Sequence, residues 1–138
     1  MKKYLLETNI CVYFLKGLYN LDKKIEKAET ANCFVSEITI AELKFGVENS
    51  EEKEKNEKTA YEFVNKFTIL PIFNSLDIYA KEKARLRKKG KPLDDFDLLI
   101  GATAISNNLT LVTRNSSDFE RMEDSLNRLR QAQPDTKL

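Results

Sequence analysis

The sequence predicts an α/β domain in which a short parallel sheet is covered by helices on both faces. Short, largely apolar runs of strand type are separated by longer segments of helical spacing, and no internal repeat is visible. Such strands are typical of parallel sheets buried on both faces, because a sheet with one wet face shows alternating polar residues. With 138 residues, the chain is long enough to bury the core of one such domain.

The first half of the chain is expected to contain two strands and three helices. Tyr4–Leu6 is a short apolar run typical of a buried strand. Helical segments follow over Thr8–Gly17 and Leu18–Ala28, and Cys33–Val35 is the second run of strand type. Helical spacing resumes over Ile38–Val47, and its inner faces are expected to carry these apolar residues: Ile38, Ala41, Phe45 and Leu43 or Val47.

A charged segment opens the second half. Glu48–Lys58 is dominated by Glu and Lys, and we interpret it as a loop and the solvated start of a helix. Thr68–Leu70 then predicts a third strand. Ser75 is a plausible N-cap for a further helix, which has Asp77 in its first turn and ends in a basic run before Gly90.

The last helix and strand are the most distinct. Asp95–Asn107 has an almost continuous apolar centre, which predicts a buried helix. Leu109–Thr113 alternates branched residues with Thr and predicts the fourth strand. The domain is expected to cover residues 1–126. Asn127–Leu138 is polar, without an apolar period, and is expected to form a disordered tail.

Composition excludes several classes of site. The chain has no histidine, which rules out imidazole general bases and histidine metal ligands. Its net charge of +1 neither supports nor excludes a nucleic-acid partner. Cys11 and Cys33 lie in apolar runs and are expected to be small core residues. No segment is apolar enough for a signal peptide or a membrane span, so we expect a soluble intracellular protein.

Three of four candidate acidic residues lie where the predicted fold would gather them. Glu7 follows the first strand, Asp97 opens the helix before the last strand, and Asp118 follows that last strand. Glu42 sits within a helix among apolar neighbours. Taken singly, each has an ordinary explanation as a cap, a turn residue or an exposed helix position. Together, three fall at the edge where parallel sheets bind ligands. Clustered carboxylates repel unless a divalent cation such as Mg²⁺ or Mn²⁺ lies among them.

Polar and basic residues around that edge are candidates for substrate contacts. Thr113 and Asn115 can bind a water or a phosphate oxygen, or can cap a turn. Arg114 is a fixed positive charge suited to a phosphate or to a plain surface role. Further candidates for substrate contacts are Lys16, Lys44 and the stretch from Arg85 to Lys89, which is equally explained by the preference of cations for helix C-termini.

Four blocks of the chain resemble motifs of the PIN-domain nucleases, especially the VapC-type toxins. Residues 5–10, LLETNI, resemble the family's LLDTNI, and residues 36–46, SEITIAELKFG, resemble S..T..EL..G. Residues 97–104, DLLIGATA, resemble DLLIAA.A, and residues 111–119, LVTRNSSDF, resemble LVT.N..DF. The blocks occur in family order and together span residues 4–121.

The resemblance implies a three-layer α/β/α domain and a cytoplasmic endoribonuclease toxin that hydrolyses RNA phosphodiesters with Mg²⁺ or Mn²⁺. It also implies a cognate VapB-like antitoxin that blocks the site, and a homodimer that joins the antitoxin in a heterotetramer or larger assembly. Carried over by position, Glu7, Asp97 and Asp118 bind the metal, and the catalytic acids are Glu7, Glu42, Asp97 and Asp118.

Glu7 departs from the family pattern, which has Asp at this position. The extra methylene shifts the carboxylate by about one C–C bond, so we expect reduced rather than absent activity. One alternative is therefore a PIN scaffold that binds antitoxin or RNA without efficient cleavage. Another is a Toprim-like phosphotransfer site with an Asp-x-Asp pair, here Asp95 and Asp97, which would require these residues at a strand end.

Overall fold

The computed structural model describes residues 2–119, 121 and 122, and its four strands form one parallel sheet in the order β3-β2-β1-β4. β1 (Tyr4–Leu6) pairs with β2 (Cys33–Ser36) on one side and with β4 (Thr110–Val112) on the other. β3 (Thr68–Leu70) forms an edge beside β2. Because β1 lies inside the sheet, the residue that follows it emerges between neighbouring strands.

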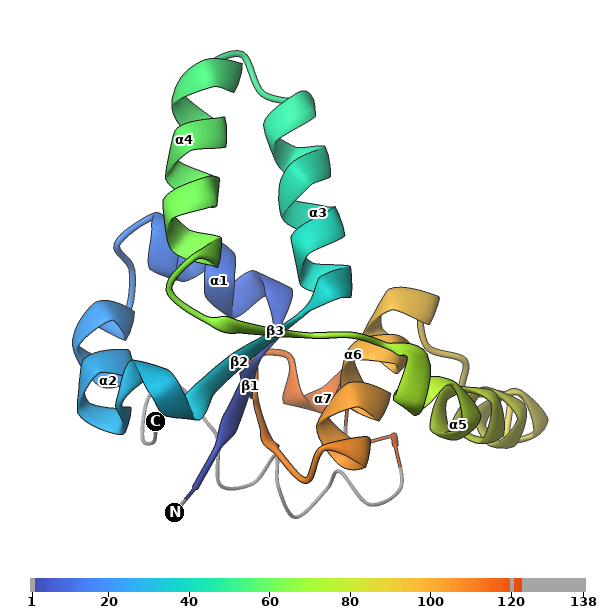
Figure 1. Cartoon of the computed structure of the whole chain (residues 1–138). Helices are drawn as coiled ribbons and strands as arrows, with labels where there is room; N and C mark the ends of the chain where they lie inside the picture. Colours follow the sequence, from blue (N-terminus) through green and yellow to red (C-terminus); the bar gives the residue numbers. More distant parts are fainter. Residues whose placement is uncertain (1, 120, 123–138) are drawn as a thin grey trace.

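Helices cover both faces of the sheet and make three layers, as the sequence predicts (Figure 1). The helices α3 and α4 also form a hairpin that projects away from the sheet (Figure 1). One layer contains α1 (Thr8–Leu15), α2 (Leu21–Ala28), α3 (Glu37–Glu48) and α4 (Lys53–Val64). The other contains α5 (Leu76–Lys88), α6 (Asp95–Ser106) and the short α7 (Ser116–Phe119), and the 3-10 turns are Thr30–Asn32 and Phe73–Ser75.

The two cores are separated by the sheet, since successive strand residues point to opposite faces. Leu5 of β1 packs into the core with Leu98 of α6. Leu6 packs into the other core with Ile10 of α1 and Phe63 of α4. This alternation explains why β1 is apolar throughout, because both of its faces are buried.

The connection from α1 to α2 differs from the prediction. α1 ends at Leu15 and α2 begins only at Leu21, because the intervening chain adopts left-handed backbone conformations. Gly17 has φ 71°, Tyr19 has φ 59° and Asn20 has φ 55°. Glycine and asparagine adopt this region readily, whereas a tyrosine there is uncommon.

The predicted inner face of α3 is partly wrong. Ile38, Thr39 and Leu43 are buried, whereas Ala41 is exposed and Phe45 is 69% exposed. The physical reason is the hairpin with α4. The C-terminal part of α3 projects beyond the sheet and is covered along one side by α4, so its remaining positions face outwards (Figure 1).

Two further positions differ in detail from the prediction. Ser75 is the N-cap residue of α5, as predicted, but its side chain makes no capping hydrogen bond, because its buried hydroxyl pairs with the Ser106 hydroxyl at 2.8 Å. Asp118, expected in a loop, lies within α7. Residues 127–138 lie outside the described part of the chain, so the tail and the domain boundary at residue 126 stay predictions.

The prediction for the cysteines is confirmed, since Cys11 and Cys33 are buried and unbridged. Burial raises the pKa of the Cys33 thiol to about 11 and that of Cys11 further, so neither is a thiolate near neutral pH. Among the helices that the structure describes, none is both long and apolar enough to span a membrane.

Candidate active site at the carboxyl edge of the sheet

Glu7 lies at the centre of the candidate site because it follows β1 directly. Its backbone N–H donates to the Val112 carbonyl at 3.1 Å and so continues the pairing of β1 with β4. Its extended backbone makes it the N-cap of α1, and its Oε2 accepts the Asn9 N–H at 3.0 Å. The side chain is only 3% exposed. An acidic group is therefore buried where the helix N-terminus can stabilise its charge.

The pKa of Glu7 is raised from 4.5 to about 7. Burial is the main cause, because the ionised form loses its hydration. The backbone N–H groups of Asn9 and Ile10 oppose this shift, while the charges of Asp97 and Glu42 add to it. Three of the four predicted acids therefore interact electrostatically, and the charges of Asp97 and Glu42 disfavour ionisation of Glu7.

Glu42 reaches this region from α3 and is oriented by two threonines. The Thr8 hydroxyl donates to Glu42 Oε1 at 2.7 Å and pairs with the Thr39 hydroxyl at 2.9 Å. Because a hydroxyl has one proton, the donation by Thr8 leaves Thr39 as the donor to Thr8. Thr39 is fully buried, so its hydrogen bond with Thr8 is shielded from water, while the bond from Thr8 to Glu42 is partly buried.

Thr8 and Thr39 had no assigned role in the sequence analysis, although a signal was available. Ser36, Thr39 and Glu42 are spaced three residues apart and therefore lie along one side of α3. Ser36 caps α3 by accepting the Ile38 N–H at 3.1 Å. The polar residues that share this side of the helix thus start the helix and orient its acid.

We expect Thr8→Val to lower the kcat of RNA cleavage by about tenfold with little change in KM, because Glu42 loses the donor that orients it. Thr8→Ser should restore the activity. Thr59→Val is the matched control, since the Thr59 hydroxyl only contacts the Lys55 carbonyl on the exposed side of α4. Cleavage by Thr8→Val at the parent rate would show that the contact has no catalytic consequence.

Asp97 lies in the first turn of α6, and its neighbours have distinct structural roles. Asp94 is the N-cap of this helix and accepts the Phe96 N–H at 3.1 Å. Asp95 is exposed and binds Lys83 at 2.8 Å, and this contact lowers its pKa. Since Asp95 and Asp97 belong to a helix, they do not have the strand-end position that the Toprim-like alternative requires.

β4 ends beside Glu7, and the remaining predicted residues follow this strand in the chain. Thr113 is buried, and its hydroxyl accepts the Asn115 N–H at 2.9 Å, which forms a tight turn after the strand. The Asn115 side chain accepts from the Ser117 hydroxyl at 3.4 Å. Asp118 lies on α7, but its side chain is outside the described part of the structure. Its role as an acid of the site stays a prediction.

The predicted basic residues differ in their contacts within the structure. The Arg114 guanidinium stacks on the Tyr19 ring, 4.0 Å from its centre. Lys16 is the exposed C-cap of α1. In the stretch from Arg85 to Lys89, Arg85 donates to Glu82 at 2.7 Å and to the Arg121 carbonyl at 2.6 Å. These contacts favour a structural role for Arg85 in joining α5 to the chain beyond α7.

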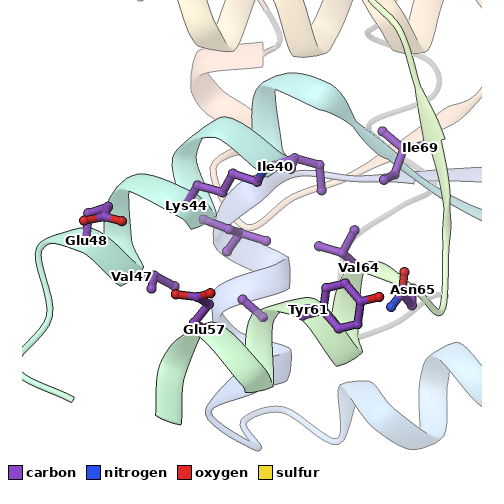
Figure 2. Close-up of a pocket in the computed structure, with 11 residues that line it drawn as sticks. Ile40, Lys44, Val47, Glu48, Glu57, Tyr61, Val64, Asn65 and Ile69 are labelled. Carbon is purple, nitrogen blue, oxygen red and sulfur yellow. The ribbon is translucent and has the colours of Figure 1, made fainter. Parts of the chain in front are cut away.

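Lys44 lines a groove between α3 and α4 (Figure 2). The groove has a volume of about 530 Å³. Lys44 is two residues from Glu42, about 200° further around the helix, so it faces away from the acids. Figure 2 shows apolar side chains along the groove with charged groups at one end. The lining residues are Ile40, Leu43, Lys44, Val47, Glu48, Glu57, Ala60, Tyr61, Val64, Asn65 and Ile69.

The carboxylate groups of the acids are ligands of the type that a divalent cation binds. Carboxylate oxygens are the hard ligands that Mg²⁺ and Mn²⁺ prefer. The pKa of Glu7 is raised mainly by burial and to a smaller extent by the charges of Asp97 and Glu42, and a cation would relieve that smaller, repulsive part. Among the described side chains, no three acids or cysteines converge into a complete metal cage. Mg²⁺ does not need a complete cage of protein ligands, since it commonly binds one or two carboxylates and keeps several waters.

A family model described as the PIN domain matches residues 4–125 of the chain. Ribonuclease VapC2 of Rickettsia felis is 36% identical over 124 residues, which cover 86% of this chain and 91% of that protein. Ribonuclease VapC2 of Haemophilus influenzae is 38% identical over 125 residues, which cover 88% of this chain and 93% of that protein.

The fold is shared with a solved toxin–antitoxin structure. A chain in the crystal structure of DNA-bound VapBC from Salmonella typhimurium has a TM-score of 0.80 and 29% sequence identity. The superposition covers 88% of this chain and 93% of the other. The similarity therefore extends over the whole arrangement of sheet, helices and carboxyl edge.

Proposed function

This chain belongs to the PIN-domain family, and on that premise we propose that it is a metal-dependent endoribonuclease toxin of the cytoplasm that a cognate antitoxin inhibits. The observation that carries the proposal is the buried Glu7 carboxyl group, whose pKa is raised partly by Asp97 and Glu42. An acidic cluster of this kind is unfavourable in a purely structural role. The ribonuclease names of the relatives favour an active enzyme over a non-cleaving scaffold.

Glu7, Asp97 and Asp118 would hold one or two Mg²⁺ or Mn²⁺ ions. Such an ion supplies a water of lowered pKa and stabilises negative charge on the phosphate. Glu42, oriented through its Oε1 by Thr8, would use its other oxygen to accept a proton or a hydrogen bond from the attacking water. Thr113 supports the turn that carries Asn115, and Asn115 would bind a phosphate oxygen or water at the rim.

The antitoxin proposal rests on the solved relatives and on the α3–α4 groove. The Salmonella structure is a complex named VapBC. The groove is largely apolar and lies between two helices, which is the shape that accepts an amphipathic helix of a partner. We propose that the cognate antitoxin occupies this groove, and that the toxin forms a homodimer which the antitoxin joins in a heterotetramer or larger assembly.

Incubation of the purified chain with single-stranded RNA tests the activity. We expect internal cleavage with Mg²⁺ or Mn²⁺ and none with EDTA. Adding the antitoxin encoded beside the gene should stop the cleavage. Cleavage unaffected by EDTA would contradict the metal-dependent mechanism, and intact RNA under all metal conditions would contradict the nuclease itself.

Glu7→Asp is expected to raise the rate of RNA cleavage severalfold, because it removes the extra methylene at the central carboxylate. Aspartate is also a favoured N-cap, so α1 should keep its start. The measurement is the kcat of RNA cleavage at saturating Mg²⁺. Glu62→Asp, which shortens an exposed glutamate on α4 by the same methylene, is the control. An Asp variant no faster than the parent would show that Glu7 already has a productive geometry.

A further inference from the structure

The turn between α1 and α2 holds an aromatic residue in an unfavourable backbone conformation. Tyr19 has φ 59°, and Asn20 after it has φ 55°. Left-handed backbone is uncommon for a bulky residue and persists where the surrounding structure requires it. Tyr19 nevertheless gains little burial there, since it is 43% exposed. Core packing therefore does not account for its position.

The Tyr19 ring is held by two contacts on the protein surface. The Arg114 guanidinium carbon lies 4.0 Å from the ring centre, which is the distance of a face-on cation–π stack. Tyr13 of α1 supports the ring edge-on, with the two ring centres 5.3 Å apart and an angle of 79° between the planes. Together these contacts define a planar surface, the Tyr19–Arg114 stack.

Arg114 connects the stack to the strand end beside Glu7. Val112, the last residue of β4, accepts the Glu7 N–H, and Arg114 follows only two residues later. Tyr19 lies beyond the C-terminal end of α1, the helix that Glu7 caps at its other end. The stack therefore extends from the carboxyl edge of the sheet, through Arg114, to the turn that follows α1.

A guanidinium group is planar and delocalised, so it stacks on aromatic rings in the way that a further ring would. Unpaired RNA bases stack on aromatic rings and on arginine planes, and this mode is common where proteins recognise loops and single strands. Stacked bases in a duplex are not accessible in this manner.

We propose that the Tyr19–Arg114 stack binds one unpaired base of the RNA next to the scissile phosphate, and thereby selects single-stranded or looped RNA over duplex. The inference rests on the proposed nuclease function, because it assigns this stack to the substrate of the same site. Tyr19 and Arg114 act here as specificity residues, and the acids perform the hydrolysis.

The test measures binding separately from cleavage. Full-length protein carrying Asp97→Asn is titrated into a fluorescent single-stranded RNA and into the matching duplex, with EDTA present. Adding Tyr19→Asn, which removes the ring but tolerates left-handed backbone, should weaken single-strand affinity by about tenfold and leave duplex affinity unchanged. Tyr19→Phe should retain the affinity, whereas Arg114→Lys, which keeps the charge but loses the planar group, should resemble Tyr19→Asn.

Phe73→Asn is the matched control. Phe73 is 78% exposed and lies after β3, at the edge of the sheet opposite β4, so its removal should not change RNA affinity. Thermal unfolding of each variant identifies any affinity loss caused by misfolding. In the cleaving parent background, Tyr19→Asn should raise KM with little effect on kcat.

Several outcomes would overturn the inference. The first is an affinity for single-stranded RNA that does not depend on Tyr19, and the second is an equal loss of affinity for the single strand and the duplex. The inference would also be wrong if the protein did not bind single-stranded RNA at all, or if the Tyr19 substitution changed binding of the antitoxin and left RNA binding unchanged. Failure of the nuclease proposal would look different. In that case the parent would leave RNA intact with Mg²⁺ or Mn²⁺ while RNA binding still depended on Tyr19.

Discussion

Asp97→Asn is expected to reduce metal-dependent RNA cleavage by at least about a hundredfold. The substitution replaces a charged oxygen ligand with a neutral amide, which binds Mg²⁺ and Mn²⁺ weakly. It also removes one of the charges that raise the pKa of Glu7. The position at the first turn of α6 tolerates a polar residue, so the fold should be retained.

Asp95→Asn is the matched control for this experiment. It makes the same chemical change two residues away in the same turn, where the carboxylate is exposed and paired with Lys83. Its cleavage rate should stay within a few-fold of the parent, because exposed pairs of this kind contribute little to stability. If both variants lost activity equally, or if Asp97→Asn cleaved at the parent rate, the assignment of Asp97 would be wrong.

Glu7→Gln is expected to stabilise the metal-free protein while eliminating its activity. The folded pKa of about 7 lies above the ordinary value of 4.5, so folding favours the protonated form. Stability is therefore greatest below the unfolded pKa and is lost as the pH rises through the folded pKa. Above that range, the ionised carboxyl group destabilises the fold by about 3 kcal/mol relative to a neutral one.

Urea denaturation in EDTA measures this effect directly. The free energy of unfolding of Glu7→Gln should exceed that of the parent by about 3 kcal/mol at pH 8 and by only about 1 kcal/mol at pH 5. Mg²⁺ should stabilise the parent more than the variant, because binding to the folded state shifts the unfolding equilibrium. Glu62→Gln on the exposed side of α4 should show neither effect. A pH-independent difference would mean that Glu7 does not titrate in this range.

The four acids show how much of the candidate site can be predicted from the sequence. Glu7 and Asp97 were placed from their positions relative to a strand and a helix, and both lie where that reasoning predicts. Glu42 was a candidate because it lies among apolar helix residues, but only the family motif assigned it to the site, since an acid in such a helix is compatible with many orientations. The hydrogen bond from Thr8 that orients Glu42 joins residues 34 positions apart, and no local pattern encodes such a contact.

The errors in the fold have the same origin. Helical spacing correctly predicts that Ile38 to Val47 is helical, but it assigned Phe45 to the interior. Spacing relates positions around one axis, whereas the buried side depends on where the neighbouring layers end. Likewise, Ser75 has the residue type of a capping side chain, but Ser106 on α6 gives its buried hydroxyl another partner.

The strands, the helices, the parallel sheet and the family could be predicted from the amino-acid sequence alone, because they depend on local periodicity and on motifs that are contiguous in the chain. The folded structure was needed for the strand order, the α3–α4 groove, the Thr39–Thr8–Glu42 contacts and the stacking of Arg114 on Tyr19. Each of these joins segments that are distant in the chain, and their distances follow from the packing of the layers rather than from any single segment.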